Sequence, residues 1–305
     1  MRVFDGRLTR LLESVQDESK WFFHDSRGRL RATQTLTTID YALSLAGDRL
    51  FVTGGPDAGP YTRDAGLPEP ADAQMHQYTA TPTGTRTYDK NGNTLTMNGG
   101  TADAVSLTYD TDNRIASSTS GAGTTTYAYD AFGDLIDSFL NFEDDGLTSY
   151  RSRPIERYRD GLLSDIWIYG PDGVAGTVTT ADLDGDGDPD RYSLLTDPEG
   201  SVIGATDAVG NAVTTYKYDD FGAPHPAGAP IDNPFLYQGL IWSPRSNVYL
   251  YGGYGYDPRT GRTTNGCLGY FDEMRNDWCE SGSLRTTPVL RLIDVARERH
   301  GDPWR

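Results

Sequence analysis

The dipeptide Tyr-Asp returns along this chain at a nearly constant spacing, each time with a turn residue three positions after the Asp. The clearest copies begin at Tyr88, Tyr109 and Tyr129, which are 21 and then 20 residues apart. A regular period is typical of repeat proteins, in which each unit packs on its neighbours instead of around one catalytic core. The spacing therefore predicts a series of small structural units.

The residue types within each copy have a physical reason. An Asp carboxylate can accept hydrogen bonds from the backbone N–H groups of the turn that follows it. Gly92 and Gly133 can then adopt a positive φ, and Asn113 holds the same place in the second copy because Asn tolerates that conformation best among non-glycine residues. The Tyr would lie at a strand end, where rings of successive copies can stack. The pattern predicts β-hairpins in series, and so an all-β fold.

Composition agrees with strands joined by tight turns and excludes some functions. Only 36 % of the 305 residues are hydrophobic, and 44 acidic residues outweigh 27 Lys and Arg to give a formal charge of −17. A broad nucleic-acid-binding face is excluded, because phosphate contacts need clustered cations. No apolar run is long enough to predict a membrane span. The first residues form no apolar signal region, so we expect export by another route or a chain that is part of a longer protein.

Four regions can be distinguished along the sequence. Residues 1–84 combine degenerate copies of the repeat, at Asp5 and Asp25, with a stretch rich in Gly and Pro at 54–83 that predicts a long surface loop. Residues 85–180 carry the clear Tyr-Asp repeats and further strand patterns. Residues 181–265 are again strand and turn. Residues 266–305 have a different residue pattern, and apolar residues at helical spacing predict a short amphipathic helix in this C-terminal tail.

An ordered series of motif blocks gives the sequence a specific likeness. The blocks lie at 192–202, 206–207, 210–211, 216–222, 233–239 and 256–262. In this order they closely resemble the Rhs repeat-associated core domain of the Rhs/YD-repeat family, and the upstream Tyr-Asp copies are similar to the same family. The resemblance covers most of residues 85–262 and, weakly, the first 35.

The resemblance implies a fold and a role. Family members are large secreted or cell-surface proteins whose YD repeats form a spiralling β-sheet, part of a hollow shell that holds a C-terminal toxin. The chain is thus expected to be a non-enzymatic shell segment acting in toxin delivery, interbacterial competition or cell contact. Its expected partners are an encapsulated toxin or an immunity protein. Because so few repeats cannot close a shell, an open sheet edge and self-association through it are also expected.

One departure from the family concerns self-cleavage. Members that release a toxin continue after the position of Gly261-Arg262 to Asp-Pro-Ile-Gly, and an Asp-based cleavage follows. In this chain the aspartate position falls on Gly266 or Cys267. Without that carboxylate the chain is expected to stay intact. The tail also holds Cys279, and for its two thiols free, disulfide-bonded and catalytic states all stay open, whereas a zinc site lacks a nearby His.

Alternating carboxylates predict a metal site. Asp182, Asp184, Asp186, Asp188 and Asp190 stand at every second position and would repel one another unless a hard divalent cation lay between them. The first residues fit the start of an EF-hand-type calcium loop, but Ser193 stands where that loop needs a bidentate Glu. The segment is therefore more similar to calcium loops between β-strands, with Asp188 contributing its backbone carbonyl. The alternative is a solvated acidic turn.

Two further functions compete with the structural role. Residues 266–305 would be a small effector toxin, although about 40 residues without a His–carboxylate cluster offer little for an active site. The Tyr-rich strands would alternatively bind sugars by stacking, which makes the chain an adhesion module for a cell-surface glycan. The sequence holds no Walker-type, Gly-x-Gly-x-x-Gly or His-Glu-x-x-His motif.

Overall fold

The computed structural model describes residues 2–4, 7–13, 18–64, 77–131, 133–140, 143–150, 153–171, 173–182, 185, 187–225, 231–251 and 253–265. The fold is all-β, as predicted, and apart from the 3-10 turn η2 (Tyr237–Gly239) the regular structure of these residues is β-strand. They divide into two compact units, residues 2–104 and residues 105–265. Among the described residues no helix is long and apolar enough to cross a membrane.

The first unit begins with an antiparallel sheet whose strands follow one another in chain order. These strands are β1 (Arg2–Phe4), β2 (Arg7–Glu13), β3 (Glu18–His24), β4 (Leu30–Gln34), β5 (Thr38–Leu43), β6 (Arg49–Thr53) and β7 (Gly59–Pro60). Three further strands follow in antiparallel pairing: β8 (Ala80–Thr81), β9 (Gly84–Tyr88) and β10 (Thr94–Gly99).

The stretch at 54–83 is more structured than a surface loop where it is described. It contains β7 and β8, and both Tyr61 and Tyr78 are buried. Their rings meet edge to face at 5.3 Å, and the buried guanidinium of Arg49 lies 5.7 Å from the ring of Tyr61. The Gly and Pro content of the stretch predicted an exposed loop and gave no sign of its two buried tyrosines. Their burial anchors the stretch to the core. Residues 65–76 lie outside the described residues.

The second unit contains a ladder in which each strand pairs antiparallel with the next. Its members are β11 (Val105–Tyr109), β12 (Ile115–Ser120), β13 (Gly123–Tyr129), β14 (Leu135–Leu140), β15 (Glu143–Tyr150), β16 (Arg153–Arg159), β17 (Leu162–Gly170), β18 (Gly173–Thr179), β19 (Asp190–Thr196), β20 (Val202–Thr206) and β21 (Ala212–Thr215). Buried and exposed residues alternate along β11 and β19, so one face of the sheet is covered.

Many strands are joined by turns with one hydrogen-bond pattern. Each of these turns begins with an Asp. The backbone carbonyl of the Asp accepts the N–H of the residue three positions later, and the backbone N–H of the Asp donates to the carbonyl of the residue four positions later. One oxygen of its carboxylate accepts the N–H groups two and four positions on, at 2.8–3.0 Å. The pattern recurs at Asp25, Asp89, Asp110, Asp197, Asp207 and Asp219, and Asp130 shares its fourth-position bond.

The backbone conformation of these turns confirms the sequence interpretation. At the third position after the Asp, φ is 83° at Gly92, 88° at Gly133 and 58° at Asn113. A residue with a β-carbon resists such values, and Asn resists them least. The turn therefore requires an Asp and, three positions later, a residue that tolerates a positive φ.

The tyrosine of the repeat has a more specific role than ring stacking. The Tyr129 hydroxyl donates to the carbonyl of Ile115 at 2.8 Å, and Tyr218 donates to the carbonyl of Val202. Ile115 and Val202 are the first residues of β12 and β20, so each phenol fixes the start of a neighbouring strand. Burial raises the pKa of both phenols, which keeps them protonated as donors.

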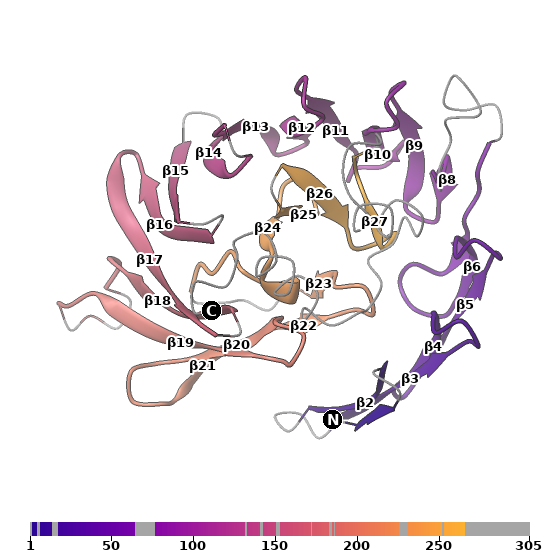
Figure 1. Ribbon diagram of the computed structural model, residues 1–305, viewed down its shortest axis with the longest axis horizontal. Helices are drawn as coiled ribbons and strands as arrows, with labels where there is room; N and C mark the ends of the chain where they lie inside the picture. The colour runs from indigo at the N-terminus through magenta and orange to yellow at the C-terminus, as the bar shows by residue number, and fades with distance from the viewer. Residues whose placement is uncertain are drawn as a thin grey trace, which may run out of the picture. The chain divides into compact units, whose positions relative to one another are not determined.

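A second layer lies on the concave side of the ladder in this unit (Figure 1). It consists of β22 (Lys217–Tyr218), β23 (Pro224–His225), η2, β24 (Ile241–Ser243), β25 (Val248–Tyr251), β26 (Tyr254–Asp257) and β27 (Arg262–Thr263). We call the described residues 216–225, 231–251 and 253–265 the inner layer. It is bonded to the ladder near both ends, because Ile115 donates its N–H to Gly253 at 3.0 Å and Val202 donates its own to Leu236 at 3.0 Å.

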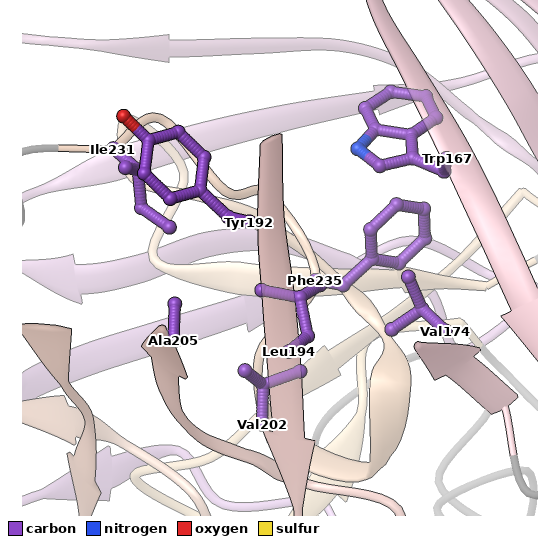
Figure 2. Packing of buried hydrophobic residues seen from close by; sticks show 8 residues of the cluster. All are labelled: Trp167, Val174, Tyr192, Leu194, Val202, Ala205, Ile231 and Phe235. Atoms are coloured by element: carbon purple, nitrogen blue, oxygen red, sulfur yellow. The ribbon is translucent and has the colours of Figure 1, made fainter. Parts of the chain in front are cut away.

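The main apolar core of the second unit lies between the ladder and the inner layer. Figure 2 shows its members, which are Trp167, Val174, Tyr192, Leu194, Val202 and Ala205 from β17–β20 with Ile231 and Phe235 from the inner layer. Phe235 meets the ring of Trp167 edge to face at 5.0 Å. Burial of these apolar side chains contributes the hydrophobic free energy that holds the inner layer against the ladder.

Gly222 and Tyr237 form the tightest contact within the inner layer. Gly222 is the positive-φ residue of the Asp219 turn, and the ring of Tyr237 lies directly over its α-carbon, where a β-carbon would overlap the ring. Tyr237 also stacks on Tyr256 with centroids 6.4 Å apart. Gly210 has the same place in the Asp207 turn, but open space surrounds it.

These two glycines allow packing to be separated from backbone strain. Gly222 has φ of 92° and Gly210 of 94°, so alanine is strained equally at both. We expect Gly210→Ala to lower the free energy of unfolding by about 1–2 kcal/mol. Gly222→Ala should lower it by about 2–5 kcal/mol, because overpacking against Tyr237 adds to the strain. Urea unfolding of both variants measures this, and equal losses would contradict the packing described here.

Candidate functional site

The acidic loop connects β18 to β19 and is exposed where it is described. Asp182 and Asp188 lie on its surface, Asp190 is the partly buried first residue of β19, and Asp184 and Asp186 lie outside the described residues. Gly185 and Gly187 have φ of 82° and 91°. The predicted position of the segment between two strands is thus confirmed.

The carboxylate of Asp182 organises the loop. One of its oxygens accepts the N–H of Gly185 at 2.6 Å, and the other accepts the N–H of Gly187 at 3.0 Å. Both bonds draw the backbone around this side chain, in the manner of an Asx turn. Each oxygen keeps a lone pair that can face a cation, so the described part of the loop is compatible with a hard metal ion.

The described acidic residues do not by themselves complete a metal site. Within the part of the chain that the structure describes, no three Asp, Glu, His or Cys side chains come close enough to hold a metal ion. A site on this loop would therefore have to include Asp184 or Asp186, which lie outside the described residues. The calcium assignment stays a prediction.

A second site is formed where the Asp197 turn meets the inner layer. Gln238, which has φ of 53°, donates its N–H to the buried Ser201 hydroxyl at 3.1 Å. Val202, the residue after Ser201, donates its N–H to the carbonyl of Leu236. Gly239 also packs against the Asp197 turn, because a β-carbon added to it would lie 3.6 Å from the carbonyl oxygen of Gly200. We call this contact between residues 197–202 and 236–240 the junction.

Two partly buried carboxyl groups of the Asp197 turn have a raised pKa. Burial, and secondarily the negative charge of Asp197, raise the pKa of Glu199 to about 7. Burial also raises the pKa of Asp197, against the lowering effect of the N–H groups that its carboxylate accepts. Glu199 is the second residue after Asp197. The residue at the same position in the Asp110 turn is Asp112, which is exposed and paired with Arg114 at 3.0 Å. The sequence interpretation did not identify Glu199, because nothing in the sequence shows what covers it.

A buried ion pair anchors the inner layer to the middle of the ladder. Arg157 on β16 donates through Nε to Asp165 on β17 at 2.8 Å, and their side chains are only 8 % and 6 % exposed. The same guanidinium donates to the backbone carbonyl of Asp232 at 3.1 Å and lies 5.6 Å from the ring of Trp167. Arg157 thus links two strands to the segment that leads into Phe235.

Comparison with known proteins gives a weak structural likeness. No protein-family model matches the chain, and no curated protein matches it. A structure of the Photorhabdus luminescens Tc holotoxin pore with a TccC3 mutation shares 14 % identity over 90 % of this chain and 18 % of that chain, with a TM-score of 0.45. The crystal structure of TcdB2-TccC3 without its hypervariable C-terminal region shares 15 % identity over 89 % of this chain and 13 % of that chain, with a TM-score of 0.44.

This chain spans less than a fifth of the length of those chains. Because the identities and the TM-scores are low, the similarity assigns neither a family nor a function to it. The likeness of residues 192–262 to the Rhs core stays a prediction from the motif blocks.

Removing one partner of the buried ion pair should cost more than removing both. We expect Arg157→Met to lower the free energy of unfolding by about 3–5 kcal/mol, because Asp165 is left buried without a counter-charge. The double variant Arg157→Met with Asp165→Leu should lose clearly less. Arg191→Met, which replaces an exposed arginine of β19, is the control and should change stability by about 0.5 kcal/mol or less. Urea unfolding measures all three, and a double variant no more stable than the single one would contradict the anchor.

Proposed function

We propose that the chain is a non-enzymatic structural segment of a secreted or cell-surface Rhs-type protein. The observation that carries the proposal is the inner layer, which is fixed against a ladder of repeated hairpins through hydrogen bonds, a buried ion pair and a shared apolar core. Such an arrangement makes a stiff curved wall. The ordered motif blocks at 192–262 support the same role.

In this proposal the ladder is the wall, and the feature that recurs along it is the geometry of its turns. The aspartates of the repeated turns are engaged by backbone N–H groups, and the repeat tyrosines donate to backbone carbonyls. Groups committed to holding turns and strand starts are not available as nucleophiles or proton carriers. A wall of this kind would serve toxin delivery or cell contact by enclosing or displaying another polypeptide.

The structural role can be separated from an effector role of the C-terminal tail. We expect the whole chain, and residues 266–305 alone, to leave growth unchanged when each is expressed in a bacterial cytoplasm. Western blots that show equal accumulation serve as the control for expression. Growth arrest by the tail or by the whole chain would overturn the non-enzymatic proposal.

We propose further that the loop from Asp182 to Asp190 binds calcium and that calcium fixes the connection between β18 and β19. The alternating carboxylates supply oxygen ligands, and Asp182 already draws the loop backbone around its side chain. Asp182, Asp184, Asp186 and Asp190 would contribute carboxylates, and Asp188 its backbone carbonyl. Millimolar calcium is sufficient even for a weak site of this type.

Calcium should stabilise the purified chain against heat. Replacing excess chelator by millimolar calcium should raise Tm by about 3–6 °C, as expected for a ligand well above its Kd. The double variant Asp184→Asn with Asp186→Asn should lose this shift. A control with Asp103→Asn and Asp112→Asn removes the same charge from exposed positions elsewhere and should keep it. A calcium shift that survives in the first double variant, or is absent from the unaltered chain, would contradict the site.

A further inference from the structure

We propose that β21 joins the ladder to a second copy of this chain, whose own β21 pairs with it as an antiparallel neighbour. β21 is the outermost strand of the ladder, and among the described strands it pairs with β20 alone (Figure 1). The proposal concerns assembly, so it does not depend on what the ladder encloses. It gives a location to the self-association that the sequence led us to expect.

The turns of the ladder show which backbone positions receive the next strand. The eighth residue after Asp110 is Ser118, which pairs with a residue of β13. The eighth residue after Asp197 is Ala205, which pairs with a residue of β21. The strand that follows each of these turns therefore takes its next neighbour at the same distance from the turn Asp.

β21 follows the same kind of turn, but its outer side has no strand among the described residues. The eighth residue after Asp207 is Thr215, whose partner on the inner side is Gly204 of β20. Tyr216 donates its N–H to the carbonyl of Ile203 at 2.9 Å. Because backbone directions alternate along an antiparallel strand, the N–H and carbonyl of Thr215 point away from β20. No backbone hydrogen bond from another described strand or loop reaches these two groups.

The outer side of β21 also lacks the features by which sheet edges avoid pairing. Protein edge strands are commonly protected by a charged side chain, a proline or a covering segment. The sequence of β21 is Ala-Val-Thr-Thr, without charge or proline, and Ala212 is exposed. After Tyr216 the chain turns into β22, which belongs to a different sheet. The edge is thus chemically suited to an extended, uncharged strand.

Exposed aliphatic side chains lie beside this edge. Leu195 of β19 and Ile203 of β20 are 48 % and 41 % exposed. The Leu195 side chain lies over Gly204, since a β-carbon added there would be 3.9 Å from it, and Gly204 pairs with Thr215 of the edge strand. A second copy would place its own aliphatic side chains near these, and their burial would stabilise the contact.

Symmetry and charge favour a second copy as the partner. Two identical strands can pair antiparallel across a twofold axis, and each then supplies the donors and acceptors that the other needs. The chain has a formal charge of −17, so two copies repel one another at long range and should meet where charge is lowest. All residues from Asn211 to Tyr216 are uncharged. Pairing through β21 therefore brings no carboxylates face to face within the strand.

Sedimentation equilibrium of the whole chain near physiological salt tests the proposal. Over about a hundredfold range of micromolar concentration, the average mass should rise from that of a monomer towards that of a dimer. Thr215→Pro should abolish the rise, because it removes an N–H that takes no part in the pairing with β20. Thr215→Lys should weaken dimerisation about tenfold or more, because a charge on an edge strand opposes pairing. Thr119→Lys, the matched control, makes the same change at an exposed position of β12 inside the ladder and should dimerise normally.

Amide hydrogen exchange locates the contact. Protection of the Thr215 N–H should rise with concentration, whereas that of the Tyr216 N–H, which is bonded to Ile203, should not change. A chain that stays monomeric over the whole range would overturn the proposal, and so would a dimer that persists in both Thr215 variants or leaves exchange at Thr215 constant. Should Thr215→Pro fail to fold, the comparison of Thr215→Lys with Thr119→Lys still decides.

Discussion

The bond between an aspartate and the backbone of its own turn is the interaction on which the second unit depends. In the Asp110 and Asp197 turns one carboxylate oxygen accepts two N–H groups and so fixes five residues in a single conformation. Where such a turn joins two strands it fixes their pairing, and a slip by one residue would send every side chain to the other face. Repetition of one turn therefore gives a sheet with one consistently covered face.

The same turns also determine where the inner layer binds. Two of the turns are followed by the strand starts Ile115 and Val202, and the amide of each of these residues bonds to the inner layer. The repeat tyrosine holds the carbonyl of these same residues through Tyr129 and Tyr218. Both polar groups of the strand start are thus satisfied, so the inner layer can cover them without leaving buried groups unpaired.

Local features of this fold could be predicted from the sequence, and long-range ones could not. The hairpins, the acceptor role of the aspartates and the positive φ of Asn113 follow from chemistry within five residues. The contacts of Arg157 with Asp232, and of Gly222 with Tyr237, join residues that no local pattern relates. Stacking was expected for the repeat tyrosines, but their hydroxyls bond to backbone carbonyls, whose positions only the folded ladder defines. The acidic loop from Asp182 to Asp190 was correctly placed between strands, whereas calcium binding and the residues that would carry it stay predictions.

Glu199 shows why identical turns can have different chemistry. Asp112 and Glu199 occupy the same position after their turn aspartates, and each donates its N–H to that aspartate at 2.9 Å. Asp112 is exposed and lies 3.0 Å from Arg114, whereas Glu199 is partly buried, and its burial together with the charge of Asp197 raises its pKa. The repeat fixes where a side chain starts, and the layer packed against it decides whether that side chain can carry a charge. Turns with the same backbone bonds can therefore differ in the proton affinity of the side chain at one position, without any change in the turn itself.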